Sequence, residues 1–444
     1  MSELILSVDE KPKKKSVWLL LSFQHIFAAF SGIVAVPIVF AGALGFNSLE
    51  TAEIISDMLI VSGVITIIQC YGVGIFGSRL PQIMGSNFAF IGPGLAIGAM
   101  AGAASEGSPQ AAYGAILGAS MLGSVVQIIL GSFIEQVKTF FPPIVQGCVV
   151  TLIGMTILGV AIDWLGGGYG SADYGSPSNL ILGISVMVLI ILLNQYGKGI
   201  VSSGAIFWGT AFGYILASSM GKLDLTPVTQ AGYLYFPRPF KYGITFNLSY
   251  ALPFAIAYLV ALVESAGDTL ACAKVANINM EEDKTRLKGS ILLGGVGSLV
   301  GAIFNATPTT TFSQNTGIVS LTGVASRFVV IGSGVILILM GLFPKFSALV
   351  AVMPAPVLGG AGVVMFGMIS AVGIGIFHEI EFDKSNMLII GISLSCGLGV
   401  TLRPNLLEKL PTIYSTILSS GITTGTIVAV GMTLIFRKIK RKSK

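Results

Sequence analysis

Charged residues are scarce in this chain of 444 residues. Asp, Glu, Lys and Arg make up 10% of it and hydrophobic residues 53%, whereas about a quarter of a typical soluble domain is charged. Cysteine is also rare, and Cys70, Cys148, Cys272 and Cys396 lie at unrelated spacings in apolar segments. These spacings argue against a disulfide framework and a zinc site, so we expect no bound metal. The composition indicates a protein that crosses a membrane many times.

Long apolar runs favour helices over a transmembrane barrel, whose strands would give short alternating patterns. A membrane helix needs about 20 apolar residues, and about fourteen segments fit such a span. They begin near Val17, Ile54, Met84, Ala111, Pro142, Leu180, Gly199, Ser249, Leu287, Gln314, Ala325, Ser347, Met387 and Thr412. The sequence therefore predicts an all-α polytopic membrane protein with about 14 transmembrane segments.

Positive charge gathers at both ends of the chain. Lys11, Lys13, Lys14 and Lys15 precede the first span, and Arg437 opens a basic tail. Most other Lys and Arg fall in loops on the same side as these tails, as cytoplasmic loops require. We therefore expect a multi-pass protein of the plasma (inner) membrane with both termini in the cytoplasm. Since topology explains the basic tails, no nucleic-acid partner is expected.

Two of the segments are abnormal. Residues 84–98 and 309–321 are short and carry Gly, Pro, Asn, Gln and Thr where the others carry Leu and Ile. They are third in each seven-span half, which is typical of a 7+7 inverted repeat with interrupted helices around a ligand. Phe88 and Phe90 alternate with small residues, and residues 309–311 are β-branched. Each segment is therefore expected to hold a short strand, and such strands must pair or line a cavity.

Glu264 and Asp268 lie one helical turn apart in the apolar run 253–273, and the pattern places no other carboxylate well inside a span. A carboxylate at mid-membrane costs about 2.5–3.5 kcal/mol, so the pair is expected to have a function. Two such like charges can share one proton. Asp268 has an equally strong alternative interpretation, as a structural cap near the interrupted tenth span. His25 in the first span is either a packed core residue or part of a proton relay.

No enzyme is expected from these residues. An intramembrane aspartyl protease needs aspartates on two facing helices, and no second span is expected to hold a central Asp. The glycine-rich stretch 166–170 follows no strand and opens no helix, which argues against a phosphate-binding loop.

Four stretches resemble one family. Gln314, Asn315, Gly317 and Thr322 match every fixed position of the signature of the nucleobase–ascorbate transporter family, also called nucleobase:cation symporter family 2. Further similar elements are Gln24 with His25, the Gly-x-Asn-Phe element around Asn87, and residues 264–268. The resemblance runs from the first span to the last, and it is greatest to bacterial xanthine or uric acid permeases.

This resemblance implies an elevator-type carrier in which a core domain moves against a gate domain. The core would comprise residues 17–135 (spans 1–4) and 249–345 (spans 8–11), and the gate would comprise residues 136–248 (spans 5–7) and 346–436 (spans 12–14). Residues 1–16 and 437–444 would be the cytoplasmic N-tail and the basic cytoplasmic C-tail. The expected partners are a purine nucleobase, the lipid bilayer and a second copy bound through the gate domain. No cofactor is implied, and a proton is the coupling ion.

The resemblance also implies a set of substrate contacts. Glu264 would accept hydrogen bonds from ring N–H groups, Gln314 and the backbone near Ser313 would read the opposite edge, and Phe88 would stack on the ring. Gln314 favours xanthine or uric acid over uracil, and Asn87 favours xanthine over uric acid.

The residues with a proton-coupling or scaffold role would be Asp268, His25 and Asn315. Gly294 departs from relatives that carry an aspartate at the matching position in the ninth span, which leaves the coupling network incomplete. Uric acid and uracil permeases of the same family remain alternatives. An anion exchanger of the same inverted-repeat fold is a further alternative, although Glu264 would repel a small anion.

Overall fold

The computed structural model describes residues 4–134, 142–280, 283–407 and 409–442, and it is mostly helical. The outer ends of the two basic tails and a loop residue such as Lys138 lie outside the described residues. Within the described residues, nine helices are long and apolar enough to cross a membrane, and a bent pair forms a tenth. Three shorter apolar helices and the segment β2–α13 complete the fourteen predicted spans.

The first seven spans lie before residue 220. Their elements are α1 (Lys15–Leu44), α2 (Ser48–Tyr71), β1 (Met84–Ser86), η1 (Phe88–Phe90), α3 (Ile91–Ala104), α4 (Pro109–Ser132), α6 (Pro143–Leu165), α7 (Pro177–Tyr196), α8 (Ile200–Ser203) and α9 (Ala205–Ser219). The short helix α10 (Thr226–Gln230) follows in the connection to the second half.

The second half repeats this order. Its elements are α11 (Leu248–Val275), α12 (Thr285–Ile303), β2 (Thr309–Thr311), α13 (Ser313–Thr322), α14 (Arg327–Leu342), α15 (Pro344–Ala351), α16 (Ala355–Ile376), η3 (Phe377–Glu379), α17 (Lys384–Leu402), η4 (Pro404–Leu407), α18 (Thr412–Leu418) and α19 (Gly421–Lys442). An 82° bend separates α14 from α15. A proline opens α15, where its missing N–H cannot continue the preceding helix.

Local sequence signals set several helix ends. Asn47 caps α2 in a capping box with Glu50, and Ser108 caps α4 directly before a proline. Gly45 adopts the left-handed conformation that ends α1. Because these ends are fixed, the polar residues inside α1, α2 and α4 are held at defined depths.

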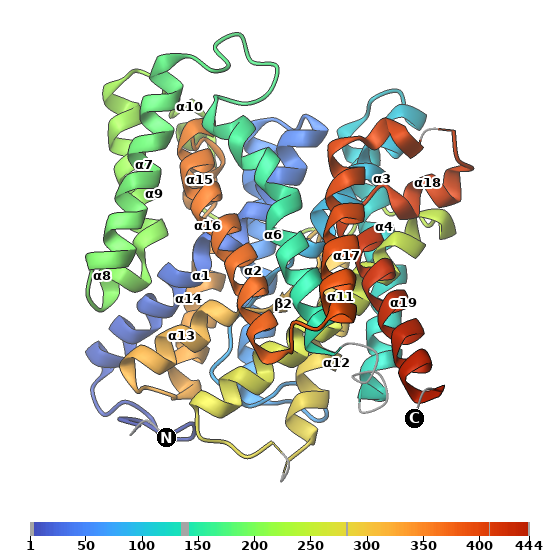
Figure 1. The fold of residues 1–444 in the computed structure, drawn as a ribbon. Coiled ribbons are helices and arrows are strands. Elements are labelled where there is room, and N and C mark those ends of the chain that lie inside the picture. The colour runs from blue at the N-terminus through green and yellow to red at the C-terminus, as the bar shows by residue number, and fades with distance from the viewer. Residues whose placement is uncertain (1–3, 135–141, 281–282, 408, 443–444) are drawn as a thin grey trace.

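The helices pack in two groups. In one group α2 lies against α14 and α1, and α4 lies against α11 and α12; in the other, α6 and α7 lie against α16, and α17 against α19. Glycine allows the close approaches, since a Cβ on Gly63 would stand 2.5 Å from the Gly334 carbonyl oxygen. Both termini lie at the same end of the molecule, the lower end in Figure 1.

The two predicted strands meet. β1 pairs antiparallel with β2, with Met84 opposite Thr311 and Ser86 opposite Thr309. The prediction that Phe88 and Phe90 lie in a strand is wrong, because residues 88–90 form a 3₁₀ turn. The reason lies in Asn87, whose Oδ1 accepts the Ala89 N–H at 2.8 Å and turns the chain into α3.

Candidate functional site

Two carboxylates of α11 face the paired strands. Asn87, directly after β1, donates from Nδ2 to Glu264 Oε2 at 3.1 Å. Thr311, the last residue of β2, donates from Oγ1 to Asp268 Oδ2 at 2.9 Å. Each interrupted span therefore holds one member of the pair, and the two carboxylates have different partners.

The predicted ligand residues of the tenth span lie at the start of α13. Ser313 and Gln314 are both exposed, whereas Glu264 and Asp268 are only partly exposed. The α11 residues 257–262, shortly before Glu264, are buried apart from Leu259, whereas Gly267 and Leu270 after it are exposed. The accessible side of the site is thus the half of α11 and α13 that leads toward the termini.

Phe88 lies at the contact between the two helix groups. Its side chain is only 6% exposed, and its ring meets that of Phe366 on α16 edge-to-face, with centroids 5.6 Å apart. An aromatic pair of this geometry contributes about 0.5–1.5 kcal/mol beyond its burial. Phe88 therefore joins the predicted ligand set to α16 in this conformation.

His25 and Asn315 form a buried pair between α1 and α13. Asn315 Nδ2 lies 3.0 Å from His25 Nδ1 and 3.2 Å from the His25 carbonyl oxygen. If the amide donates to both, His25 Nδ1 is an acceptor and its ring proton lies on Nε2. Both side chains are almost fully buried, so this pair fixes α13 against the first span.

The remaining signature positions lie along α13. A Cβ on Gly317 would meet no atom within 4 Å. Thr322 Oγ1 donates to the Ile318 carbonyl at 2.8 Å and accepts the Val324 N–H at 3.2 Å. Thr322 therefore closes the helix end, which makes it a scaffold residue of the signature.

Gly294 faces a glutamine that the sequence alone did not single out. A Cβ at position 294 would stand 2.6 Å from Gln127 Nε2, and this amide donates to the Ile291 carbonyl at 3.1 Å. Gln127 thus fills the space that a side chain at position 294 would need. Position 294 has no acidic side chain, and Gln127 of α4 occupies the space instead. No local sequence pattern predicts this contact between α4 and α12.

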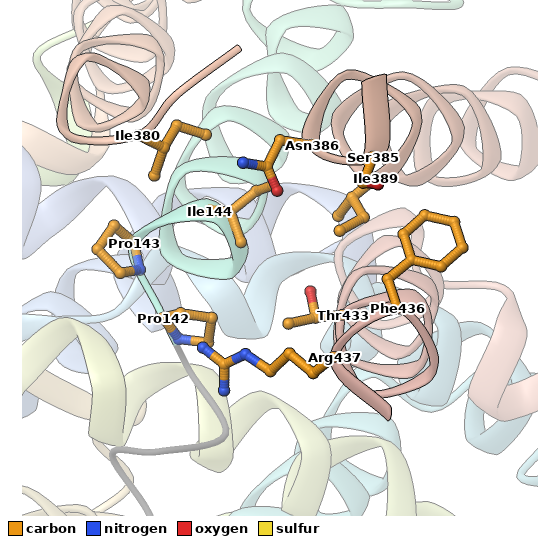
Figure 2. A pocket seen from close by; sticks show the side chains of 10 residues that line it. All are labelled: Pro142, Pro143, Ile144, Ile380, Ser385, Asn386, Ile389, Thr433, Phe436 and Arg437. Carbon is orange, nitrogen blue, oxygen red and sulfur yellow. The ribbon is translucent and has the colours of Figure 1, made fainter. Parts of the chain in front are cut away.

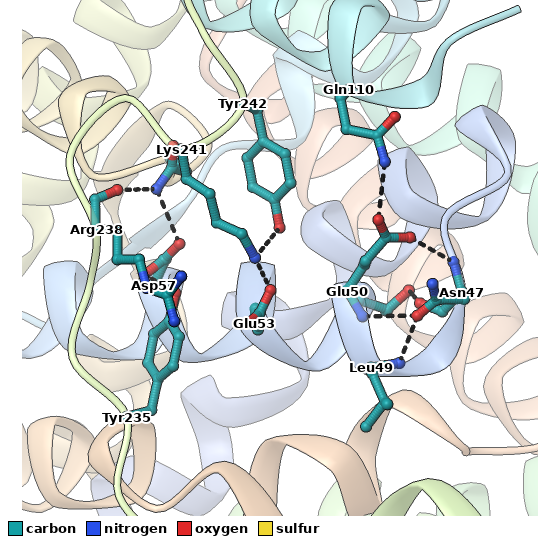
Figure 3. A network of polar contacts seen from close by, with 12 residues as sticks. Asn47, Leu49, Glu50, Glu53, Asp57, Gln110, Tyr235, Arg238, Lys241 and Tyr242 are labelled. Atoms are coloured by element: carbon teal, nitrogen blue, oxygen red, sulfur yellow. Dashed lines mark hydrogen bonds and ion pairs between the residues drawn. The ribbon is translucent and has the colours of Figure 1, made fainter. Parts of the chain in front are cut away.

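Asp57 is a third carboxylate inside a span, and its side chain is fully buried. The prediction that Glu264 and Asp268 are alone inside the spans is therefore wrong. Tyr235 donates to Asp57 Oδ1 at 2.9 Å, and Asn305 Nδ2 donates to Oδ2 at 3.1 Å. Figure 3 shows this network, in which Lys241 also forms an ion pair with Glu53. The apolar pattern starts near residue 54, but the capped helix begins at Ser48, so Asp57 lies well within α2. The capping box is the sequence signal that reveals this earlier start.

Asp57 is expected to matter for stability. Asp57→Leu would leave the Tyr235 hydroxyl without its acceptor and remove one of two acceptors from Asn305, whose Nδ2 also donates to the Arg238 carbonyl. The cost of such unpaired groups is about 1–3 kcal/mol. We expect a lower apparent melting temperature in detergent for this variant, whereas Tyr235→Phe, which leaves Asp57 the Asn305 donor, should lower it less. Equal melting temperatures for Asp57→Leu and the unaltered protein would contradict a structural role.

A cavity of about 200 Å³ lies elsewhere, between α6, α17 and α19. Figure 2 shows its lining, which includes Ile144, Asn386, Thr433 and Arg437 but none of the predicted ligand residues. It is therefore distinct from the site between α11 and the strands. Among the residues that the structure describes, no group of three or more His, Cys, Asp or Glu side chains could hold a metal ion.

Curated relatives match this chain along nearly its whole length. A Clostridium perfringens protein named as a candidate purine permease is 43% identical over 98% of this chain and 93% of its own. The xanthine permease of Bacillus subtilis is 36% identical over 96% of this chain and 94% of its own. The uric acid transporter UacT of Escherichia coli is 36% identical over 94% of this chain and 86% of its own.

Solved structures share the fold at low sequence identity. The transmembrane domain of the cyanobacterial bicarbonate transporter BicA gives a TM-score of 0.62 at 14% identity, covering 96% of this chain and 100% of that one. The murine anion transporter Slc26a9 in its inward-facing state gives a TM-score of 0.63 at 12% identity. The match covers 97% of this chain and 69% of that one. A family model described as a permease family matches residues 16–406. The chain therefore belongs to the nucleobase–ascorbate transporter family and is a multi-pass membrane permease, not an enzyme.

Proposed function

We propose that this protein is a proton-coupled symporter that imports an oxidised purine nucleobase by an elevator-type movement, and that xanthine is its preferred substrate. The observation that carries the proposal is the position of Glu264, which accepts a hydrogen bond from Asn87 directly after β1 and is still partly exposed. Its helix, α11, also packs against α13. A carboxylate in a membrane site suits a neutral ring with adjacent N–H donors. A small anion would be repelled by it, which counts against the anion exchange of the structural neighbours.

The other substrate contacts follow from the same arrangement. Gln314 offers both a donor and an acceptor and is exposed at the start of α13, next to the exposed Ser313. We assign them to the ring edge opposite Glu264, with Phe88 against the ring face. Asn87 supports xanthine through the family resemblance at this position, and its amide donates to Glu264. Uric acid is the alternative substrate, since relatives named for either purine are equally similar to this chain.

Proton coupling is assigned to the carboxylate pair and His25. Glu264 and Asp268 lie one turn apart on α11, so a shared proton reduces their mutual repulsion. Asp268 accepts a hydrogen bond from Thr311, and His25 lies behind α13 against Asn315. Asp268 is therefore the first residue to test as the proton carrier and His25 the second, with Asn315 as the scaffold residue that holds His25.

The moving elements correspond to the two helix groups. We assign residues 17–135 and 249–345 to the core and 136–248 and 346–436 to the gate, which also makes the contact between two copies. Packing supports this division, because α4 lies against α11 and α12, whereas α6 lies against α16. The second half of α11, where Gly267 and Leu270 are exposed, runs toward the end of the molecule that carries the termini (Figure 1). We place the protein in an inner membrane of the bacterial type with both termini in the cytoplasm. In that orientation, the site of this conformation opens toward the cytoplasm.

Uptake by purified protein in lipid vesicles tests the proposal. Labelled xanthine should accumulate when a proton gradient is imposed, and an uncoupler should abolish the accumulation. A competition panel of xanthine, urate, hypoxanthine, guanine and uracil ranks the substrates. Sulfate or bicarbonate uptake without purine uptake would overturn the assignment.

Gln314→Glu should weaken purine uptake. The substitution removes the amide donor and adds a second negative charge near Glu264, so the purine edge loses one hydrogen bond and the site becomes harder to desolvate. We expect a rise of about tenfold or more in the KM for xanthine, from the loss of about 1.4 kcal/mol or more. Ser320→Ala, an exposed position on the same helix, is the matched control. An unchanged substrate profile would show that Gln314 does not read the substrate.

A further inference from the structure

The segment that precedes α1 folds back onto the core of the protein. Leu6 pairs in parallel with Val324, in the connection that follows α13. The Ile5 N–H donates to the Gly323 carbonyl at 2.8 Å, and the Leu6 carbonyl accepts the Ala325 N–H at 2.9 Å. The Arg327 N–H donates to the Val8 carbonyl at 3.0 Å. Residues 5–8 are therefore held by main-chain hydrogen bonds to residues 323–327, with one β-bridge between Leu6 and Val324. We refer to residues 5–8 as the N-terminal strand.

Side chains extend this attachment. Asp9 Oδ1 forms an ion pair with Arg327 Nε at 2.8 Å, and Lys11 Nζ lies 4.5 Å from the centre of the Phe328 ring. Ser326 donates to the Glu10 carbonyl. Trp18 at the start of α1 donates to the Phe328 carbonyl at 2.8 Å. These contacts are spread from residue 5 to the first span, so the whole segment is attached to the start of α14.

Val8 is the buried residue of the N-terminal strand. It is 3% exposed and packs in a cluster with Cys272 and Ala273 of α11 and Val319 of α13. Cys272 lies one turn beyond Asp268 on α11, and Val319 lies between one and two turns beyond Gln314 on α13. Val8 thus belongs to an apolar cluster that includes residues of both helices that carry the assigned substrate ligands, at the ends that leave the site.

We propose that the N-terminal strand is a brace for the substrate site, and that Val8 is a positioning residue which sets α11 relative to α13. The proposal rests on the function assigned to Glu264 and Gln314. Because two ligands on separate helices must reach one planar substrate together, loss of the brace weakens binding more than it slows turnover. The attachment is similar to β-augmentation, in which main-chain hydrogen bonds give affinity and buried side chains give specificity.

Val8→Asp tests the brace. A carboxylate without a partner is not tolerated in the apolar cluster, so the strand detaches. We expect the KM for xanthine to rise about tenfold while the maximal rate changes less than about twofold, because the ligands are misplaced but the moving elements remain. Val8→Ile should keep the unaltered KM. Ile5→Asp is the matched control, since Ile5 lies in the same strand and is 73% exposed.

Deletion of residues 4–10 covers the case in which Val8→Asp does not reach the membrane. The deleted protein should show the same rise in KM, and a synthetic peptide of residues 4–12 should restore it where a scrambled peptide does not. An unaltered KM in both the deletion and Val8→Asp would overturn the proposal. A fall in the amount of folded protein with an unaltered KM would also overturn it, because that result indicates stability alone.

A test without substrate separates the brace from the assigned function. Leu6→Cys with Val324→Cys places two thiols at paired positions, within the Cα separation that a disulfide requires. Oxidation should link them in the unaltered background and fail to link them with Val8→Asp. Efficient linking in both would overturn the proposed role of Val8, whatever the substrate is.

Discussion

Glu264→Gln is expected to abolish purine uptake while leaving folded protein in the membrane. Gln presents an N–H₂ group where the carboxylate offers only acceptors, so it meets the ring N–H donors with a donor of its own. It also cannot take up a proton. Sites built to hydrogen-bond a substrate discriminate by about 10⁴-fold when a partner is wrong, and from the same principle we expect at least about a 100-fold loss of uptake for this single contact.

Glu264→Asp is the informative control for this change. It keeps the charge and the acceptors but shortens the side chain, so the hydrogen bond from Asn87, 3.1 Å long in the structure, must lengthen or the helix must shift. We expect measurable uptake with a raised KM. Equal membrane abundance and a single symmetric peak in gel filtration must accompany each variant. Normal xanthine transport by Glu264→Gln would remove the assignment of the substrate site.

Gly85→Val is expected to prevent the two interrupted spans from packing. A Cβ at this position would stand 2.5 Å from Phe312 Cζ and 2.8 Å from Ile33 Cγ1, and valine adds two further methyl groups. Overpacking of this kind costs about 1–3 kcal/mol, and here it also displaces Asn87, two residues along the chain. We expect a lower apparent melting temperature together with loss of uptake.

Phe312 offers a direct check of the mechanism for Gly85→Val. Its ring also leaves no space for a side chain at Gly32, where a Cβ would stand 2.8 Å from Phe312 Cε2. Phe312→Ala removes the ring, so combining it with Gly85→Val should cost less than the sum of the two single changes. Gly317→Ala is the control for a glycine with free space, since a Cβ there meets nothing within 4 Å, and it should leave the melting temperature unchanged or slightly raised. Additive losses for the pair would show that the collision is not the cause.

Much of the fold follows from the sequence, because a bilayer permits few solutions for a spanning chain. Long apolar runs of this kind form helices, and polar interruptions at matching places must pair with each other or line a cavity. The strand at residues 309–311 is confirmed, and so is its meeting with the first interrupted segment. The family is confirmed as well, since its signature residues occupy a short stretch whose spacing does not depend on distant packing.

The errors come from interactions between distant regions of the chain. Phe88 alternates like a strand residue, but the Asn87 side chain competes for the next N–H and forms a turn. Asp57 stands near the start of an apolar run in the sequence, and its partners, Tyr235 and Asn305, are brought to it from far along the chain. The N-terminal strand has no strand pattern of its own. Its pairing partner, Val324, lies beyond the tenth span, so no local pattern predicts the contact.

The pairing of β1 with β2 has a consequence for synthesis. A nascent chain that has inserted its first seven spans holds β1 without its partner. The Ile83 carbonyl and the Asn87 N–H, which bond to Phe312 and Pro308 in the folded protein, then face the membrane interior unpaired. Only after the tenth span is inserted can these groups bond, so the two halves must meet before either becomes stable. Truncated chains that end before Thr309 should therefore be recognised as misfolded by membrane proteases, even though every helix before that point is complete.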